Sequence, residues 1–398
     1  MPFISSASEL SWLNVASHLD PRFGGIAKML PEFCAAVSDS GRCTASLLGF
    51  CEEGERSSLC GQAFIAAETI SPGKFAWLTG ARRKLLSGKL AGFDGVHIHG
   101  LWEEHTFAAV RAARTAGKPY IVSAHGMLEP WALRNKRWKK VIYSWLTERQ
   151  NLSGAACLHA LTEAEAKDYR RYGVKVPIAI IPNGVHVNEG ATQEPFLEAF
   201  PALRGQRLVL FLGRVHHKKG LDLLVDAWKT VAAGTADAHL VIAGPDFENT
   251  RACIERRIQE LGIGASVTFT GMLQSGLKWS ALAACELFVL PSYSEGLSVS
   301  VLEALGMQKP VIVTDACNIS EVRERGCGWV TTPEVTPIAA ALHEFLRTPR
   351  TVASEMGRRG GTLVKERFSW DTIGTQTRAV YRWVAGGAKP LGVRMVWE

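Results

Sequence analysis

The stretch that most constrains the fold spans residues 287–315, LFVLPSYSEGLSVSVLEALGMQKPVIVTD. Its apolar run at 287–290 has the length of a buried parallel strand, and the apolar residues that follow recur at helical spacing. A second apolar run at 310–313 begins another strand. The sequence therefore predicts a strand–loop–helix–strand unit, with the loop at the carboxyl edge of a parallel sheet, where α/β folds bind ligands. Two carboxylates lie there, Glu295 in the loop and Glu303 in the helix.

The role of Glu303 has two interpretations on chemistry alone. A helix amino end carries free N–H groups and partial positive charge, so this segment suits an anionic ligand such as a phosphate. Ser300 and Glu303 also form an S-x-x-E pattern, which is common where helices begin. The residues by themselves leave both interpretations open.

The sequence around the two carboxylates contains PS, EG, LEAL and KPVIVTD in order. In this setting the segment resembles the Glu-x7-Glu signature of retaining glycosyltransferases of family 4. The resemblance implies a GT-B fold, which has two facing Rossmann-like domains with parallel sheets. It also implies that Glu295 contacts the donor sugar and that Glu303 binds the nucleotide ribose. The residues after Glu295 that we expect to bind the donor are Gly296, Leu297 and Ser298.

A second candidate loop, which is basic, follows the apolar strand predicted at residues 207–213. Arg214 can bind a diphosphate bidentately, and Lys219 can bind it as a point charge. Residues 213–220 match the G-R-x-x-x-x-K-G pattern of the resembling family, in which these side chains neutralise the leaving diphosphate. That family places its nucleobase contacts, largely through the backbone, at a position that corresponds here to Gly271, Met272 and Leu273.

The amino-terminal half offers two further candidates. Gly24 and Gly25 precede a predicted helix and allow close backbone approach to a phosphate. They are not part of a G-x-G-x-x-G pattern, so nicotinamide binding finds no support. His125 ends a strand predicted at 120–124, and in the resembling family a His at this point contacts the donor sugar. We expect His97 and His99, which alternate on the strand predicted at 95–99, to pack at the sheet edge.

We expect two α/β domains in the order of the GT-B fold. The first comprises residues 1–190 and is completed by 371–398, the linker is 191–205, and the second domain comprises 206–370. A final helix at 370–384 should cross back onto the first domain. The amino-terminal domain is expected to receive the acceptor, and the carboxyl-terminal domain to bind the nucleotide sugar.

The net charge of +7 is concentrated in one region, because residues 71–150 hold 14 Lys or Arg against 5 Asp or Glu. This region includes the run RNKRWKK at 134–140, with Trp131, Trp138 and Trp145 nearby. Basic residues interleaved with Trp suit an anionic membrane surface or a nucleic acid. An ordinary solvated helix face remains an alternative.

The cysteines, the apolar runs and the amino terminus indicate the cellular location of the chain. Nine cysteines are scattered without C-x-x-C pairs, which indicates reduced thiols. No apolar run is long enough to span a membrane, and the amino terminus lacks the pattern of a signal peptide. We expect a cytoplasmic protein, attached peripherally to the inner face of the cytoplasmic membrane, with no nucleic acid partner.

The function that these patterns predict is retaining transfer of a hexosyl group from a nucleotide diphosphate sugar to a saccharide acceptor. The text HGMLEPWAL with a basic tract behind it resembles bacterial family-4 enzymes that build surface polysaccharides. This implies a lipid-linked acceptor in polysaccharide or lipopolysaccharide biosynthesis. No D-x-D reads as a metal site, so we expect neither a metal nor a cofactor. The alternatives are a GT-B epimerase or phosphorylase-like enzyme, and a non-catalytic nucleotide-sugar-binding subunit.

Overall fold

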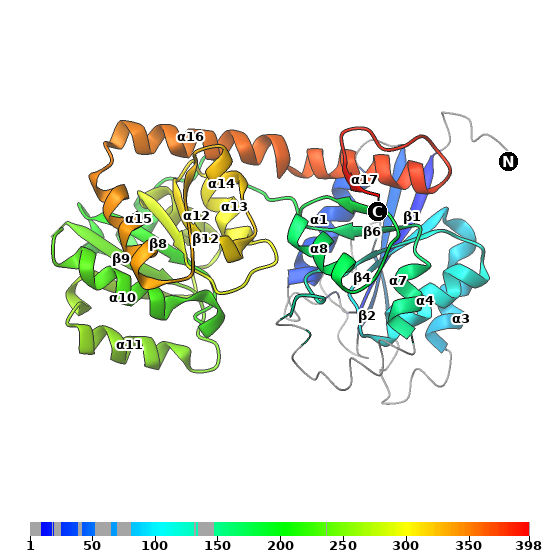
Figure 1. Ribbon diagram of the computed structural model, residues 1–398, viewed down its shortest axis with the longest axis horizontal. Coiled ribbons are helices and arrows are strands. Elements are labelled where there is room, and N and C mark those ends of the chain that lie inside the picture. The colour runs from blue at the N-terminus through cyan, green and yellow to red at the C-terminus, as the bar shows by residue number, and fades with distance from the viewer. Residues whose placement is uncertain are drawn as a thin grey trace. The chain divides into compact units, whose positions relative to one another are not determined.

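The computed structural model describes residues 9–17, 19, 25–38, 42–51, 65–69, 81–130, 133, 147–235 and 237–397. The chain divides into two compact units (Figure 1). Unit 1 comprises Met1–Gly184 together with Trp370–Glu398, and unit 2 comprises Val185–Ser369. Within the described residues, no helix has the length and apolar character needed to cross a membrane.

Unit 1 is built on an eight-stranded sheet in the order β14-β7-β6-β5-β4-β1-β2-β3. Its strands are β1 (Leu10–Ala16), β2 (Cys43–Cys51), β3 (Ile65–Thr69), β4 (Gly95–His99), β5 (Tyr120–Ser123), β6 (Cys157–Ala160), β7 (Ile178–Ile180) and β14 (Arg394–Val396). Strands β1 to β7 pair in parallel. The edge strand β14 pairs with β7 in the antiparallel direction, so the sheet is parallel, as predicted, except at this edge.

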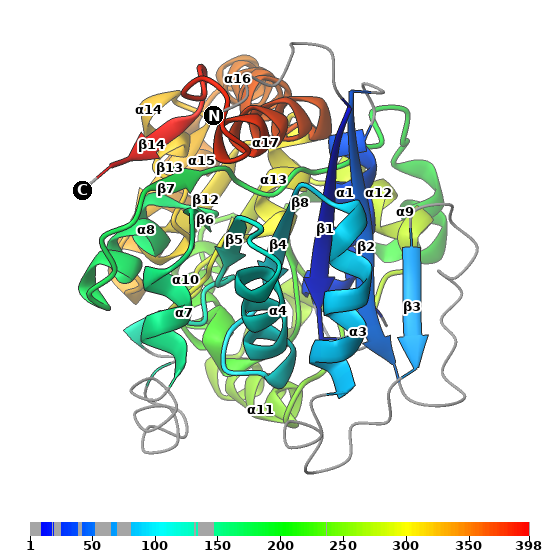
Figure 2. The same cartoon turned by 90° about the vertical axis from the view of Figure 1, so that its right-hand side faces the viewer.

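Two helical layers cover the sheet of unit 1, since alternate side chains of a strand point to opposite faces. Trp12 of β1 packs in one core cluster, and its neighbour Leu13 packs in another. Helices α1 (Gly25–Ser38) and α17 (Trp370–Val384) pack on the Trp12 face. Helices α3 (Ala81–Lys89), α4 (Glu104–Thr115) and α8 (Glu163–Arg171) lie on the Leu13 face, where Figure 2 shows α3 and α4 over the strands. A short helix, α7 (Arg149–Ser153), precedes β6.

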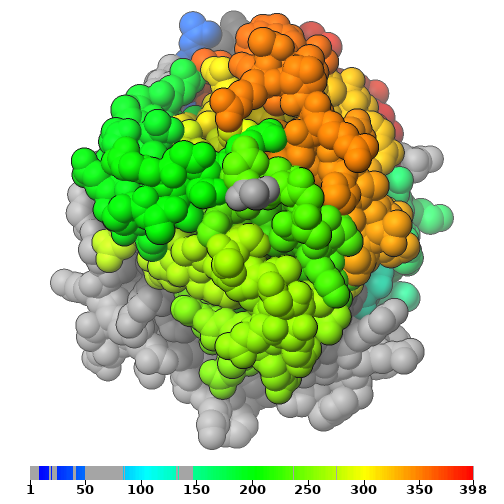
Figure 3. Space-filling model, turned by 90° about the vertical axis from the view of Figure 1, so that its left-hand side faces the viewer, coloured from blue at the N-terminus to red at the C-terminus, as the bar shows by residue number. Residues whose placement is uncertain are grey.

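Unit 2 holds a six-stranded parallel sheet in the order β10-β9-β8-β11-β12-β13. The strands are β8 (Arg207–Leu212), β9 (Ala238–Ala243), β10 (Val267–Gly271), β11 (Leu287–Leu290), β12 (Val311–Thr314) and β13 (Gly328–Thr331). The helices are α9 (Glu194–Ala199), α10 (Leu221–Ala232), α11 (Thr250–Leu261), α12 (Ser275–Ala284), α13 (Val299–Gly306), α14 (Glu321–Glu324), α15 (Val335–Arg347) and α16 (Arg350–Arg367). Figure 3 shows a face of this unit where α11, in yellow-green, and the orange residues of α15 and α16 reach the surface.

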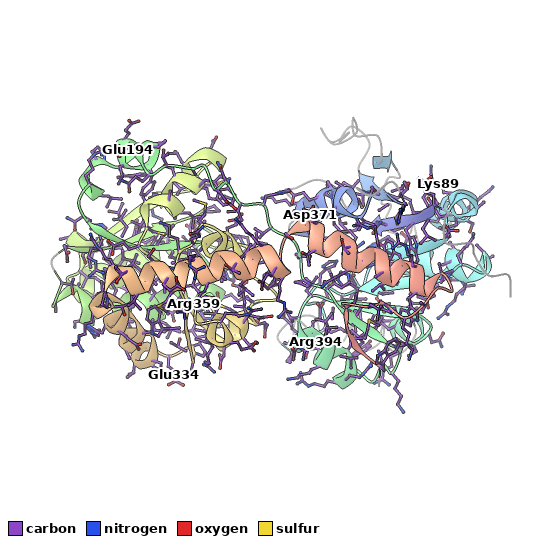
Figure 4. All side chains as sticks on the ribbon, turned by 90° about the horizontal axis from the view of Figure 1, so that it is seen from above. Lys89, Glu194, Glu334, Arg359, Asp371 and Arg394 are labelled. Atoms are coloured by element: carbon purple, nitrogen blue, oxygen red, sulfur yellow. The ribbon has the colours of Figure 1, made fainter. Side chains whose placement is uncertain are left out.

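Both units therefore have the Rossmann-like α/β arrangement that the sequence predicts, and the fold class is confirmed. The last helix belongs to unit 1, where α17 packs against α1, while α16 belongs to unit 2. In Figure 4, Arg359 marks α16, Asp371 marks the first turn of α17 and Arg394 marks β14.

The segment 191–205 differs from the expected linker, because it contains α9 and packs on unit 2. Phe196 N donates to Ser280 Oγ at 2.9 Å, and Ser280 Oγ donates to Thr192 O at 2.6 Å. The side chain of Phe196 is buried in the core of unit 2. A polar stretch with Pro predicts a turn-rich segment. Here two aromatic side chains, Phe196 and Phe200, pack against each other and against the core of unit 2, and this packing stabilises the helix.

Candidate active site

The loop that follows β11 carries Glu295 and is fixed by hydrogen bonds on several sides. Ser292 Oγ donates to Glu295 Oε1 at 2.7 Å, and Lys219 Nζ lies 2.5 Å from the same oxygen. The backbone is held as well, since Glu295 N donates to Ala316 O and Asn318 Nδ2 donates to Glu295 O. The structure thus places Glu295 and Lys219, both predicted from the sequence, in one ion pair at the carboxyl edge of the sheet of unit 2.

The loop that carries Lys219 follows β8 and lies against the loop after β11. Tyr293 N donates to Lys218 O, and the rings of Tyr293 and His217 lie 5.4 Å apart. Gly220, the N-cap residue of α10, then has a left-handed backbone, φ 67°. A Cβ atom at Gly220 would lie 2.0 Å from Pro291 O, so only glycine allows the two loops to approach this closely.

Glu303 lies on α13 and is almost fully buried. Lys278 Nζ, from α12, donates to Glu303 Oε1 at 2.7 Å. The helix begins after Ser298, which is its N-cap residue, and Ser300 lies within the first turn. The interpretation of Ser300 and Glu303 as a capping box is therefore wrong. The acid of the helix instead has a lysine partner that the sequence analysis did not identify.

Arg214 has different surroundings from Lys219. Its side chain is exposed, and its guanidinium carbon lies 5.1 Å from the centre of the Phe247 ring. Within the described residues it forms no ion pair, so it is available to an anion at the carboxyl end of β8. The role of Arg214 at a diphosphate remains a prediction.

The other predicted donor-binding residues of unit 2 lie at the same sheet edge. Gly271 ends β10 with φ 70°, and its carbonyl accepts from Gly244 N at 2.8 Å. Met272 is 70% exposed, and Leu273 is partly buried against the core. Gly296 and Leu297 connect Glu295 to the helix cap Ser298, whose Oγ lies 3.2 Å from Ser300 Oγ.

In unit 1, His125 follows β5 with a left-handed backbone, φ 52°, which is uncommon for a residue other than glycine. Two residues of α8 hold the backbone on either side of it. Tyr169 Oη accepts from Ala124 N at 2.7 Å, and Glu165 Oε1 accepts from Gly126 N at 2.7 Å. The uncommon conformation is thus imposed by buried polar groups, as is typical of functional sites.

The sequence patterns did not identify Glu165 and Tyr169 as site residues, because both lie in an ordinary amphipathic helix. Both side chains are buried. Burial raises the pKa of the Glu165 carboxyl group to about 7, while hydrogen bonds from Leu161 N and Gly126 N favour its charged form. The signal available in the sequence was the capping pattern at Thr162 and Glu165, which the structure realises as Glu165 N donating to Thr162 Oγ1.

The ring of His125 is partly buried and contacts His99, whose Nδ1 lies 3.0 Å from His125 Nε2. Burial lowers the pKa of His125 to about 3, and the nearby His159 adds to this effect. His125 is therefore a neutral imidazole at ordinary pH. It can offer a ligand one hydrogen bond without carrying charge.

Two sets of predicted residues lie partly or wholly outside the described residues. Gly25 begins α1, and a Cβ atom there would meet nothing within 4 Å, but Gly24 lies outside the described residues. The basic run at 134–140 and Trp131, Trp138 and Trp145 also lie outside them. Among the residues that the structure does describe, no group of three or more His, Cys, Asp or Glu is arranged to hold a metal ion.

Two family models match the sequence. Residues 193–360 match the model described as glycosyl transferases group 1, and residues 51–184 match the model described as a glycosyl transferase 4-like domain. Together the two matches cover more than half of the chain, and each falls largely within one of the two units.

Individual relatives agree with these matches. The chain is 27% identical over 282 residues to alpha-D-kanosaminyltransferase of Streptomyces kanamyceticus, which covers 68% of this chain and 72% of the relative. It is 25% identical over 228 residues to GDP-mannose:cellobiosyl-diphosphopolyprenol alpha-mannosyltransferase of Xanthomonas campestris, covering 57% of each chain. Anabaena Alr3699/HepE in complex with UDP and glucose superposes with a TM-score of 0.73 at 19% identity, covering 94% of this chain and 99% of that one.

Proposed function

Because this chain belongs to glycosyltransferase family 4 and has the GT-B fold, we propose that it transfers a hexosyl group, with retention, from a nucleotide diphosphate sugar to a saccharide acceptor. The observation that carries the proposal is the pairing of Lys219 with Glu295 beside the pairing of Lys278 with Glu303. Each glutamate forms an ion pair with a lysine at the carboxyl edge of the sheet, where α/β folds bind ligands.

The two pairs support different roles. Glu303, nearly buried on α13, is suited to accept hydrogen bonds from the ribose hydroxyl groups, and Lys278 keeps its carboxylate oriented. Glu295, in the loop, is suited to accept from hydroxyl groups of the donor sugar. Lys219 is held by Glu295 before any ligand arrives, so its charge is already in place for the phosphates.

In the proposed reaction, the bond between the anomeric carbon and the diphosphate breaks as the acceptor oxygen attacks the same face of the sugar. Negative charge grows on the diphosphate, and Lys219 and Arg214 stabilise it there. A leaving phosphate oxygen takes the proton of the acceptor hydroxyl group. Cations that are already in position stabilise such charge without the reorganisation that water requires.

We propose that these cationic side chains perform this neutralisation without a metal ion. An enzyme treated with a chelator and then dialysed should keep its activity. If Mg²⁺ or Mn²⁺ were needed to restore it, this part of the proposal would be wrong.

The acceptor that we propose is a saccharide on a lipid diphosphate carrier, used in the synthesis of a polysaccharide or lipopolysaccharide. Two observations support it: the basic, Trp-containing region at residues 71–150, and the similarity to the Xanthomonas relative, whose name specifies a diphosphopolyprenol acceptor. The basic region would place the protein on the inner face of the cytoplasmic membrane, because cationic side chains are attracted to anionic headgroups.

The experiment that tests the proposal begins with a thermal-shift screen of UDP-, GDP- and ADP-sugars. The donor that stabilises the protein is then incubated with and without saccharide acceptors, and the anomeric configuration of the product is read by NMR. Retention in a glycosylated product supports the proposal. An epimerised donor without transfer would indicate the epimerase alternative, and tight donor binding without any turnover would indicate a non-catalytic subunit.

A further inference from the structure

A chain of hydrogen bonds runs through the interior of unit 1 and ends at His125. Its members come from β1, β4, β5, β6, α17 and the segments after β5 and β7, and all except His125 are buried. In order, the contacts are Ile181 O to His159 Nε2 (2.7 Å), His159 Nδ1 to Ser123 Oγ (2.8 Å), Ser123 Oγ to His97 Nε2 (2.7 Å), His97 Nδ1 to Tyr381 Oη (2.8 Å), Tyr381 Oη to the Asn14 amide (3.2 Å), Asn14 to His99 Nε2 (3.0 Å) and His99 Nδ1 to His125 Nε2 (3.0 Å).

Each imidazole in this chain carries a single proton at ordinary pH. Burial lowers the pKa of His159 to about 4, and it lowers the pKa of His97 and His99 well below the usual range. The pKa of His125 is lowered to about 3 for the same reason. A neutral imidazole has one nitrogen that donates and one that accepts. The direction of each bond therefore determines the direction of the next.

The first bond is fixed by the carbonyl of Ile181, which can only accept, so His159 donates from Nε2. His159 Nδ1 then accepts, and Ser123 must give it the hydroxyl proton. Ser123 Oγ in turn accepts from His97 Nε2.

That assignment leaves His97 Nδ1 as an acceptor, which receives the single proton of Tyr381. The phenol oxygen of Tyr381 then has no proton left for the Asn14 amide.

With Oδ1 of Asn14 facing Tyr381 Oη, the 3.2 Å contact would have two acceptors and no proton. Turning the amide by 180° exchanges its oxygen and nitrogen, which are alike in size. The NH₂ group then donates one proton to Tyr381 Oη and the other to His99 Nε2. In exchange, the amide gives up its hydrogen bond to Ser46 O, and its oxygen then faces that carbonyl oxygen; the cost is small because the contact is 3.5 Å long.

We propose that this chain fixes the tautomer of His125, so that His99 Nδ1–H donates to His125 Nε2 and His125 directs its own Nδ1–H out of the network. Among the described residues, His125 Nδ1 has no partner, and the ring is not fully buried. His125 thus presents a neutral donor that suits an acceptor oxygen, such as a sugar hydroxyl oxygen. This last step rests on the proposed function, whereas the tautomer does not.

Tyr381 is then a positioning residue, because it acts on His125 only through Asn14 and His99. It belongs to α17, and the sequence places it 256 residues from His125. Its ring stacks on Trp12 with centroids 4.0 Å apart, a contact that phenylalanine preserves. In Tyr381→Phe the Asn14 amide loses its phenol partner. It is then free to donate to Ser46 O and to accept from His99 Nε2, which reverses the tautomers of His99 and His125.

The test is NMR of protein labelled with ¹⁵N-histidine, in which protonated and unprotonated ring nitrogens give well-separated signals. The signals of His125 are assigned by their loss in His125→Gln. We expect the Nδ1–H tautomer of His125 in the wild type and the Nε2–H tautomer in Tyr381→Phe. An Nε2–H tautomer in the wild type, or an unchanged tautomer in Tyr381→Phe, would overturn the proposal.

Tyr120→Phe is the matched control, because it removes another buried hydroxyl group of unit 1 that bonds Asn151 O and lies outside the chain. It should leave the tautomer of His125 unchanged. We expect kcat/KM for the donor to fall about tenfold in Tyr381→Phe, the effect of one neutral hydrogen bond, and to stay near wild type in Tyr120→Phe. A reversed tautomer with unchanged kcat/KM would uphold the chain and remove His125 from donor binding.

Discussion

Lys219 Nζ lies 2.5 Å from Glu295 Oε1, although 76 residues separate the two in the sequence. The contact follows from the sheet, because β8 and β11 are parallel neighbours and the loops after them leave the same edge. The lysine is only 16% exposed and the glutamate 12%. An anionic ligand at this edge therefore meets a cation whose position is fixed in advance.

We predict that Lys219→Ala and Arg214→Ala lower turnover more than binding, since charge on the leaving diphosphate grows as the glycosidic bond breaks. Losing one such stabilising group typically costs about 10²–10³ in rate. Steady-state kinetics together with calorimetry of nucleotide binding measure the two effects. Lys229→Ala, which removes an exposed lysine at the end of α10, is the control. Wild-type turnover in Lys219→Ala or Arg214→Ala would exclude that residue from the site.

Gly220→Ala should disrupt the approach of the two loops. A Cβ atom there meets Pro291 O at 2.0 Å, so we expect a loss of about 3 kcal/mol in the free energy of unfolding, with lower activity. Gly262 has almost the same backbone, φ 68°, but nothing lies within 4 Å of an added Cβ atom. Gly262→Ala should lose only about 1 kcal/mol and keep its activity. Urea denaturation compares the two, and equal losses would contradict the explanation.

Glu303→Ala is predicted to weaken the binding of the free nucleotide, because a ribose contact exists in the ground state and the transition state alike. Hydrogen bonds to a charged group contribute about 1.5–3 kcal/mol, so we expect Kd to rise about 10- to 100-fold. Lys278→Met should have a smaller effect of the same sign, because it removes the cation that orients Glu303. Unchanged affinity of Glu303→Ala for the nucleotide would show that the acid has only a structural role.

Glu165 gives a prediction about pH. Its folded-state pKa of about 7 lies above the ordinary value of 4.5, mainly because the carboxyl group is buried. Folding therefore takes up a proton between these values, and stability falls as the pH rises through this window. Glu165→Gln does not titrate. The unfolding free energy of the wild type relative to this variant should thus decrease by about 3 kcal/mol across the window. A constant difference would contradict the shifted pKa.

The same group should affect activity in the opposite direction. Above about pH 7 the charged carboxylate accepts from both Gly126 N and Leu161 N, whereas the protonated acid has one oxygen that is a poor partner for an N–H group. The backbone of His125 should then be held less well. We expect kcat/KM of the wild type to fall below about pH 7, and Glu165→Gln to lack this dependence.

The sequence predicted those parts of the fold that depend on local patterns. The strands at 95–99 and 287–290 and the helix at 370–384 have the bounds that the apolar periodicity indicated. Strands β3, β13 and β14 were not predicted, because all three are edge strands and their segments lack a long apolar run. Edge strands bury less surface, so their composition resembles that of loops.

The candidate site shows the same division. Glu295, Lys219 and His125 lie in loops at strand ends, where the order of strand and helix alone indicates a ligand edge. Lys278, Glu165 and Tyr381 lie inside helices, and each reaches its partner only through tertiary packing. His97 and His99, which were expected to pack at the sheet edge, are buried on the central strand β4, and their hydrogen bonds to Tyr381 and Asn14 depend on α17 and β1 meeting. The spacing of residues along the sequence does not predict such contacts.

The last prediction concerns the basic, Trp-containing region, whose run at 134–140 lies outside the described residues. Lys and Arg near an anionic surface contribute about 1 kcal/mol each, and Trp favours the interface. The protein should therefore co-sediment with vesicles that contain anionic lipid, and binding should weaken as salt is added. Changing Arg137, Lys139 and Lys140 to Glu should abolish it.

The matched control for that variant makes the same change of charge elsewhere, at the exposed residues Lys175, Lys229 and Arg256. If net charge alone drove the binding, both triple variants would lose it equally. If the basic run is the contact, only the first should, since headgroup attraction falls off within a Debye length of about 10 Å. Wild-type protein that ignores anionic vesicles at low salt would contradict membrane attachment. The transferase proposal would be unaffected, because it depends on Lys219, Glu295 and Glu303 in unit 2.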